Sequence, residues 1–398
     1  MDAIDRVLKA MEHEEPDRVP TYEALLDNPQ IYKHLGEDYS YNGLTKTISD
    51  SYEVCNGDTK ELTKLFLQAT ESRSYLKNMM NKWCGLFEKM SVDLFTVPLT
   101  GHIFYPQHVE KTSFTDEYGR NFDFKYNREY DIELIYYRDG AFKTFEDYLA
   151  VPKPDPDNVR REKNFKAMKA ADKVKQGKVY AMPGIWGLFE ATWQGFGFSD
   201  FSKLLIHSEK IKKIFDDRGK FSVEVVKRFI EWGEENLVFI LDDYGYKSGL
   251  MMSPRNYKKF VIPWIKEICK VAHKGGLKVI LHSCGDIYKI FEDLINAGVD
   301  AFNPIETTTA NPDYDIFKLN ERFGDKTTFI GNVSPQDLST ESPEFIHNYT
   351  KKLIKELAPG GGYILSTGHS LNPAVKLENY LAMQDAYKKY GKYPIKID

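Results

Sequence analysis

The chain has 398 residues, 42% of them hydrophobic, and a formal net charge of −5. This mild charge, with no basic block, argues against partners such as nucleic acid or an anionic membrane surface. No apolar run is long enough to span a bilayer, and the first residues lack the apolar core of a signal peptide, so we expect a cytoplasmic protein. The four cysteines have no disulfide-like spacing and are expected to be reduced thiols.

Strand and helix patterns alternate along most of the chain. An amphipathic helix over residues 3–11 comes first, and helices over residues 29–89 follow the first strand. Eight short apolar runs are predicted strands, each followed by a helix: residues 18–25, 92–99, 178–183, 237–241, 278–282, 300–306, 327–331 and 362–369. Such alternation predicts an α/β fold, a closed (β/α)8 TIM barrel with an N-terminal helical extension, and we expect residues 1–398 to form one domain.

A different pattern interrupts this alternation between about residues 103 and 156. Short alternating runs occur at residues 121–125 and 132–138, and turn residues such as Gly119 bound them. They predict an inserted β-hairpin region, closed by the proline-rich turn at residues 151–156.

The stretch over residues 275–286 is the most informative one. It is a short, β-branched run bounded by glycines, which is typical of a buried strand. His282 and Cys284 are two residues apart at its C-terminal end, so their side chains are expected on the same side. An imidazole and a thiolate are donors that zinc accepts. At this point the alternative interpretation, a core histidine beside a buried thiol, stays open.

Chemistry in such barrels occupies the C-terminal ends of the strands. His282, Cys284, Glu306 and His369 lie at three of these ends and predict a zinc site with nitrogen, sulfur and oxygen donors. Asp242 and Asp243 are a candidate metal-binding or proton-handling pair, although an acidic pair there can equally cap the next segment. We therefore take Asp242, Asp243 and Glu306 as candidate catalytic residues. The candidates for cofactor binding are Tyr22, Trp186 and Asn332.

The chain resembles the uroporphyrinogen decarboxylase superfamily over nearly its full length. The resemblance rests on Asp-Asp-Tyr-Gly at residues 242–245, Leu-His-Ser-Cys-Gly at residues 281–285, Gly-Asn at residues 331–332 and Gly-His at residues 368–369. It implies a (β/α)8 barrel, which agrees with the independent count of strands.

Two branches of this superfamily differ in the residues they use. The true decarboxylases carry an arginine-rich segment after the first strand, which binds the substrate's carboxylates, whereas residues 22–27 contain no arginine here. The zinc-dependent corrinoid methyltransferases, including the methylcobamide:coenzyme M methyltransferases and related demethylase components, carry a His-x-Cys that matches His282 and Cys284. Their glutamate on the next strand matches Glu306. Their third ligand is usually a cysteine, and His369 stands nearest to that position.

The resemblance therefore implies a zinc-dependent methyltransferase that works with a corrinoid protein. It would move a methyl group between cobalt and a small methylated substrate or thiol acceptor, and a homodimer is one assembly compatible with it. Two alternatives remain open. One is a decarboxylase of the uroporphyrinogen decarboxylase type, and the other is a non-catalytic barrel that binds a corrinoid or a tetrapyrrole.

Overall fold

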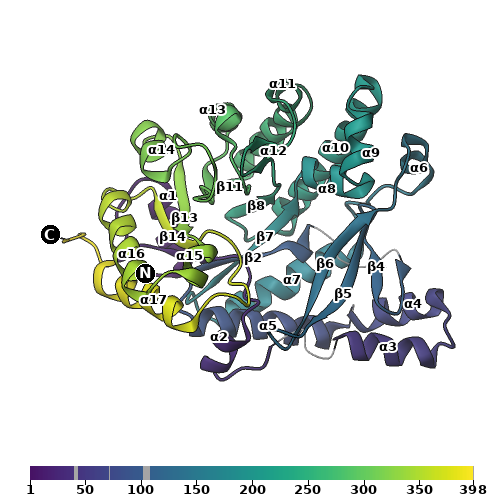
Figure 1. Ribbon diagram of the computed structural model, residues 1–398, viewed down its shortest axis with the longest axis horizontal. Helices are drawn as coiled ribbons and strands as arrows, with labels where there is room; N and C mark the ends of the chain where they lie inside the picture. Colours follow the sequence, from purple (N-terminus) through teal and green to yellow (C-terminus); the bar gives the residue numbers. More distant parts are fainter. Residues whose placement is uncertain (40–43, 71, 102–107, 398) are drawn as a thin grey trace.

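A closed barrel of parallel strands forms the centre of the molecule (Figure 1). A computed structural model describes residues 1–39, 44–70, 72–101 and 108–397. Neighbouring strands follow the order β1-β14-β13-β12-β11-β8-β7-β2. Their bounds are β1 Thr21–Glu23, β2 Leu94–Val97, β7 Tyr180–Trp186, β8 Leu237–Leu241, β11 Lys278–His282, β12 Ala301–Asn303, β13 Thr328–Val333 and β14 Tyr363–Thr367. The predicted barrel and its eight strands are confirmed.

Helices surround the barrel and connect its strands. Those before the inserted segment are α1 Ala3–Met11, α2 Pro29–His34, α3 Leu44–Val54, α4 Thr59–Thr70 and α5 Arg73–Lys89, with the 3-10 turn η1 Pro98–Thr100 after β2. Those after it are α6 Phe145–Ala150, α7 Val159–Val174, α8 Leu188–Phe196, α9 Phe198–Leu204, α10 Ser208–Trp232, α11 Pro254–Asn256, the π-helical η2 Tyr257–Val261, α12 Ile262–Lys274, α13 Tyr288–Ala297, α14 Ile316–Phe323, α15 Pro335–Thr340, α16 Pro343–Leu357 and α17 Leu377–Tyr390. No helix within the described residues is both long and apolar enough to span a membrane.

The alternation of side chains along β11 decides which of them face the interior of the barrel. Val279 and Leu281 belong to the core between strands and helices, whereas Ile280 belongs to a separate cluster that fills the barrel. Because the side-chain period of a strand is two, His282 shares the inward side with Ile280. His282 is paired in register with Leu241 of β8 and Asn303 of β12, so the ends of these strands lie side by side.

A buried ion cluster ties α1 to the other end of the barrel. Asp93, which directly precedes β2, is 0% exposed. Its carboxylate accepts from Arg6 Nη1 at 2.6 Å and from Arg18 Nη1 at 2.7 Å, and Arg6 Nε also donates to Asp17 at 2.6 Å. The two arginines pair with the two carboxylates at the N-terminal end of β2. The cluster is therefore structural and lies away from the C-terminal strand ends.

Asp17 makes the stability of this cluster depend on pH. Its hydrogen bond with Arg6 lowers the pKa of Asp17 from an ordinary 3.8 to about 2. A depressed carboxylate pKa adds stability above the ordinary pKa, and this stability is lost as pH falls through the folded-state value. Because the side chain is partly exposed, we expect Asp17→Asn to lower the free energy of unfolding by only about 1 kcal/mol at neutral pH.

The measurement is urea denaturation of the wild type and Asp17→Asn at a series of pH values. The difference between them should stay constant above about pH 5 and shrink towards pH 2. A difference that does not change over that range would contradict the assignment of this pKa shift to Arg6.

The segment between β2 and α6 forms an antiparallel sheet with strands in the order β3-β4-β5-β6, which lies beside α3 and α4 (Figure 1). The bounds are β3 His108–Val109, β4 Ser113–Thr115, β5 Arg120–Asn127 and β6 Ile132–Gly140. The predicted hairpin corresponds to β5 and β6. The strands β3 and β4 were too short for a sequence pattern, and residues 102–107 of the predicted insertion lie outside the described residues. A further short antiparallel pair, β9 Gly245–Tyr246 and β10 Gly249–Leu250, follows β8.

Candidate metal site at the barrel mouth

Three predicted ligands converge at the C-terminal ends of the barrel strands. The donor atoms of His282, Cys284 and His369 all lie within 4.8 Å of one another. His282 ends β11, Cys284 lies two residues further on in the following turn, and His369 lies two residues beyond β14. The distance between His282 Nε2 and Cys284 Sγ is 3.5 Å.

This spacing fits a tetrahedral metal ion. Zinc binds nitrogen at about 2.0–2.1 Å and thiolate sulfur at about 2.3 Å, which places two such donors about 3.5 Å apart. The separation of His282 Nε2 and Cys284 Sγ therefore agrees with joint ligation. Three protein donors also leave one position open, as catalytic zinc sites require.

The orientation of the His282 ring is fixed by Asn303. Asn303 Nδ2 donates to the carbonyl oxygen of Ile330 at 3.1 Å, so its Oδ1 faces His282. His282 Nδ1 donates to that oxygen at 2.8 Å. With the proton on Nδ1, the Nε2 lone pair points towards Cys284. This arrangement is typical of metal-ligating histidines, whose other nitrogen donates to an oxygen acceptor.

The position of Cys284 depends on contact between two loops. Its backbone N–H donates to Asp243 Oδ1 at 2.7 Å, and Asp286 N–H donates to the carbonyl oxygen of Tyr246 at 3.0 Å. Gly285 has a φ of +76°, and a Cβ atom there would lie 2.2 Å from the backbone carbon of Gly245. The loops after β8 and β11 can therefore meet backbone to backbone only because neither has a side chain at this point.

The electrostatic surroundings favour a bound cation. Burial raises the pKa of Cys284 well above its ordinary value, and the charges of Asp243, Glu306 and Glu190 raise it further. His369 has an exposed surface at the rim, but burial of its imidazole among protein atoms, and secondly neighbouring His282, lower its pKa while Asp243 and Glu306 oppose this shift; the lowered pKa favours the neutral form that can ligate. A thiol among carboxylates becomes a thiolate readily only when a metal ion supplies compensating positive charge.

Asp242 has a clear structural function. Its carboxylate accepts from the backbone N–H groups of Phe189 at 3.0 Å and Glu190 at 2.6 Å, which are at the start of α8. Asp242 therefore caps a helix, but this helix precedes β8 in the chain, whereas the alternative interpretation of the sequence had the acidic pair capping the segment that follows. Burial raises the pKa of Asp242 to about 7, while the two backbone hydrogen bonds oppose that shift. Its catalytic function, like that of Asp243, stays a prediction.

Glu306 lies near the three donor atoms, but it is not among the residues whose donor atoms lie within 4.8 Å of one another. It is half-buried, and Thr308 Oγ1 donates to its Oε1 at 2.8 Å. Its negative charge raises the pKa of both Cys284 and His369, so the carboxylate lies close to these two ligands. Its ligation of a metal and its catalytic function both stay predictions.

The three residues predicted to bind a cofactor have other partners in the protein. Tyr22 is 1% exposed in the barrel interior, with its hydroxyl 3.1 Å from Thr96 Oγ1. The Trp186 ring stacks on the Arg120 guanidinium at 4.3 Å, and Asn332 Oδ1 accepts from the Ile305 N–H at 3.2 Å. Their cofactor-binding functions stay predictions.

Two acids near the site, half-buried Glu190 and buried Glu23, were not singled out from the sequence. Glu190 on α8 accepts from Gln194 Nε2 at 2.8 Å, and burial together with Asp243 raises its pKa well above the ordinary value. Glu23 at the end of β1 accepts from Thr367 Oγ1, and burial raises the pKa of Glu23 to about 8. The rim position of Glu23 was a usable signal, whereas Glu190 is on a helix that the sequence pattern did not relate to the site.

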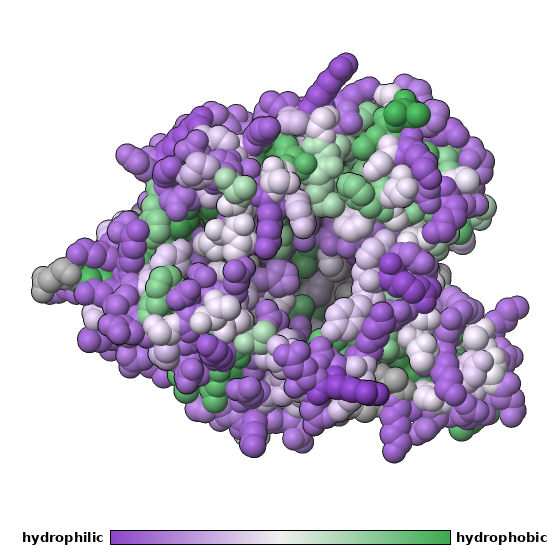
Figure 2. All heavy atoms as spheres, in the orientation of Figure 1, coloured by the Kyte–Doolittle hydropathy of each residue, from purple (hydrophilic) through white to green (hydrophobic). Residues whose placement is uncertain are grey.

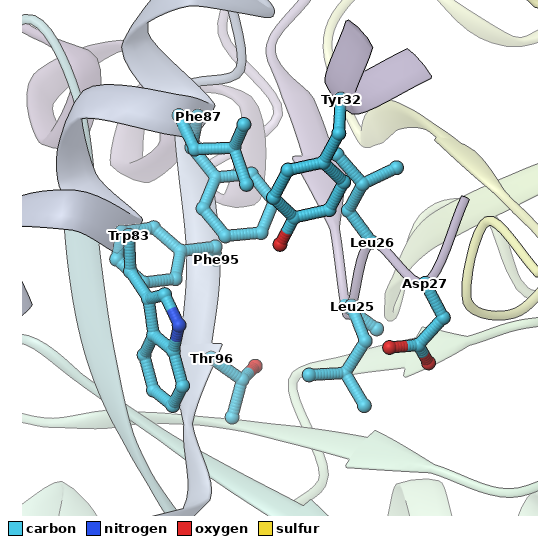
Figure 3. A pocket seen from close by; sticks show the side chains of 10 residues that line it. Leu25, Leu26, Asp27, Tyr32, Trp83, Phe87, Phe95 and Thr96 are labelled. Atoms are coloured by element: carbon cyan, nitrogen blue, oxygen red, sulfur yellow. The ribbon is translucent and has the colours of Figure 1, made fainter. Parts of the chain in front are cut away.

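The molecular surface is hollowed between the part of the chain carrying α8 and α9 and the inserted sheet (Figure 2). Beside the first two strands there is also a cavity of about 20 Å³, where Tyr32, Phe95, Thr96 and Asp27 face one another (Figure 3). That volume holds about one water molecule and no organic substrate.

The fold and these residues define a (β/α)8 barrel with a candidate metal site at its mouth. The family model described as uroporphyrinogen decarboxylase (URO-D) matches residues 131–390. The chain belongs to the uroporphyrinogen decarboxylase family, which is a family of enzymes.

Similar proteins carry two different names. Uroporphyrinogen decarboxylase of Coxiella burnetii (strain RSA 493 / Nine Mile phase I) is 27% identical over 159 residues, which is 39% of this chain and 41% of that protein. The enzyme of the same name from Vesicomyosocius okutanii is 26% identical over 212 residues, or 52% of this chain and 58% of that protein. The matched stretches thus span about two fifths to three fifths of these relatives.

A solved structure described as a methyltransferase from Methanosarcina mazei has a TM-score of 0.67 and 18% sequence identity. The similarity covers 98% of this chain and 99% of that one. At this identity the similarity supports the fold alone.

Proposed function

We propose that this protein is a zinc-dependent methyltransferase, which moves a methyl group between a small substrate and the cobalt of a corrinoid carried by a partner protein. The observation that carries the proposal is the convergence of His282, Cys284 and His369 at the barrel mouth. The methyltransferase from Methanosarcina mazei shares this fold over its full length, which is compatible with the proposal. Bound zinc would supply a Lewis acid, which lowers the pKa of a thiol or stabilises a departing oxygen.

The protein's own residues would prepare this chemistry. Asn303 holds the His282 ring with Nε2 facing the site, and Asp243 holds the backbone of Cys284. Cys284 would hold the ion as the thiolate, and its proton would pass to solvent when a cation binds. The half-buried Glu306 carboxylate is close enough to interact electrostatically with Cys284 and His369. It would fill the open position until substrate takes it.

Decarboxylation of a porphyrinogen is the second candidate function, because the family model and the relatives carry that name. Residues 22–27, however, include no arginine to bind the substrate's carboxylates. This segment contains the buried Tyr22 and the acid Asp27 instead of arginines. Burial raises the pKa of Asp27 to about 6. Incubation with uroporphyrinogen tests this candidate directly, and release of carbon dioxide at an enzymatic rate would favour it over methyl transfer.

Zinc content and methyl transfer test the leading proposal. Purified protein should hold about one zinc ion per chain and should change the absorbance of a methylated corrinoid protein in the presence of an acceptor. Well under one zinc per chain in protein reconstituted with zinc would contradict it. Tight binding of a corrinoid with no turnover would instead favour a non-catalytic barrel.

The variant Glu306→Gln tests whether Glu306 is needed to hold zinc or only occupies the position that substrate would take. We expect this variant to keep zinc and to change kcat by roughly tenfold or more, since a carboxylate charge near the reacting atoms is lost. His369→Ala is the matched comparison, and its zinc content should fall because it removes one of the three clustered donors. Zinc loss in Glu306→Gln with full zinc in His369→Ala would reverse the two assignments.

A further inference from the structure

A cavity of about 250 Å³ lies outside the barrel, between α10 and the proline-rich turn that follows α6. Tyr148 and Phe221 line it with aromatic rings, and Pro154 and Pro156 add apolar surface. Its lining shares no residue with the metal site. Neither the family nor the proposed methyl transfer accounts for it.

Arg218 of α10 lines this cavity and is only 4% exposed. Its Nη2 donates to the carbonyl oxygen of Tyr118 at 3.1 Å, and its guanidinium stacks on the Tyr118 ring at 4.4 Å. Its Nε and Nη1 find no acceptor among the described residues. A buried cation whose donors are unsatisfied is unfavourable unless an anion completes the site.

The charges on the cavity wall leave it positive. Asp217 and Glu224 line it, but their carboxylates already pair with lysines of the same helix that do not line it, Lys213 at 2.5 Å and Lys227 at 2.7 Å. Asp217 also accepts from the Tyr148 hydroxyl at 3.0 Å.

Two lysines add positive charge at the rim of the cavity. Lys153 stacks on the Tyr148 ring at 3.6 Å, and exposed Lys220 lies two residues beyond Arg218 on α10. Burial lowers the pKa of Lys153, nearby Asp217 opposes this shift, and the positive charges of Arg218 and Lys213 lower the pKa further.

We propose that this cavity binds a small organic anion, with a carboxylate or phosphate group on Arg218 and an apolar body against Phe221 and the two prolines. A guanidinium is well suited to both anionic groups. The volume and the aromatic walls favour a ligand larger than a bare inorganic ion, because most of the accessible surface of the cavity is apolar and offers no hydrogen bond.

Calorimetric titration of the full-length protein tests this site with three probes at constant ionic strength: phenyl phosphate, benzoate and inorganic phosphate. We expect saturable binding of one organic anion per chain, and the stronger of phenyl phosphate and benzoate identifies the anionic group. Cys284→Ala should bind equally well, because the cavity is separate from the metal site. Failure of the proposed methyl transfer would therefore leave this result unchanged.

Arg218→Gln should weaken binding roughly 10- to 100-fold, as expected for the loss of charge-assisted hydrogen bonds. The control is Lys212→Gln, on the same helix and outside the cavity lining, which should leave affinity unchanged. If Arg218→Gln does not fold, Lys220→Gln replaces it, with an expected weakening of about two- to fivefold for an exposed charge.

Several outcomes would overturn the proposal. These are the absence of saturable binding by any probe, unchanged affinity in Arg218→Gln or, if that variant does not fold, in Lys220→Gln, and binding that disappears in Cys284→Ala. Inorganic phosphate that binds as tightly as phenyl phosphate would overturn the assignment to an organic anion.

Discussion

Cys284→Ala is expected to lose zinc and methyl transfer while the barrel stays folded. The thiolate is the strongest donor of the clustered set, and two imidazoles alone cannot complete a tetrahedral site. We expect zinc affinity to fall by more than about 100-fold, beyond the 10- to 100-fold typical of losing a hydrogen-bond partner of a ligand. Metal analysis after dialysis against a weak chelator measures this loss.

The fold should survive this substitution because the core does not depend on the metal. Cys284 lies in a turn beyond β11, whereas the strand itself packs through Val279, Ile280 and Leu281. The control is Cys55→Ala, which removes a half-buried thiol between α3 and α4. It should keep both zinc and activity. Full zinc occupancy in Cys284→Ala would reject the zinc site, and with it most of the case for methyl transfer.

The sequence was sufficient to predict the barrel because its strands are buried on both sides. Residues 237–241 and 279–281 are continuously apolar and buried or nearly so, and helical segments separate the strands. The rule that chemistry gathers at the C-terminal strand ends then brought His282, Cys284 and His369 together before any geometry was known. The structure agrees, since their donor atoms lie within 4.8 Å of one another.

Contacts between distant segments could not be predicted in the same way. Asn303 lies within the predicted strand over residues 300–306, but its hydrogen bond to His282 depends on the register of β11 and β12. Glu190 approaches Asp243 only because α8 begins on the Asp242 cap. In the sequence Arg218 is an ordinary polar residue of a helix, and only in the structure does it line a cavity with the turn after α6. Each depends on tertiary packing that no local pattern encodes.

Gly285→Ala should damage the site through the backbone alone. A residue other than glycine at a φ of +76° is strained by roughly 1–2 kcal/mol. Here the added Cβ would also lie 2.2 Å from the backbone carbon of Gly245 and 2.4 Å from the backbone nitrogen of Tyr246, so the two loops must separate. We expect the free energy of unfolding to fall by about 3–5 kcal/mol in total, within the range of severe single substitutions.

Gly276→Ala is the matched control, because Gly276 lies at the other end of the same strand. It has a similar φ of +84°, but an added Cβ would meet nothing within 4 Å. That variant should lose only the roughly 1–2 kcal/mol of backbone strain and keep its zinc. Gly285→Ala should in addition lower zinc affinity by about tenfold or more, because separating the loops weakens the hydrogen bond between Cys284 N–H and Asp243. Equal losses of stability and equal zinc affinity in the two variants would show that the close approach of Gly245 and Gly285 does not position Cys284.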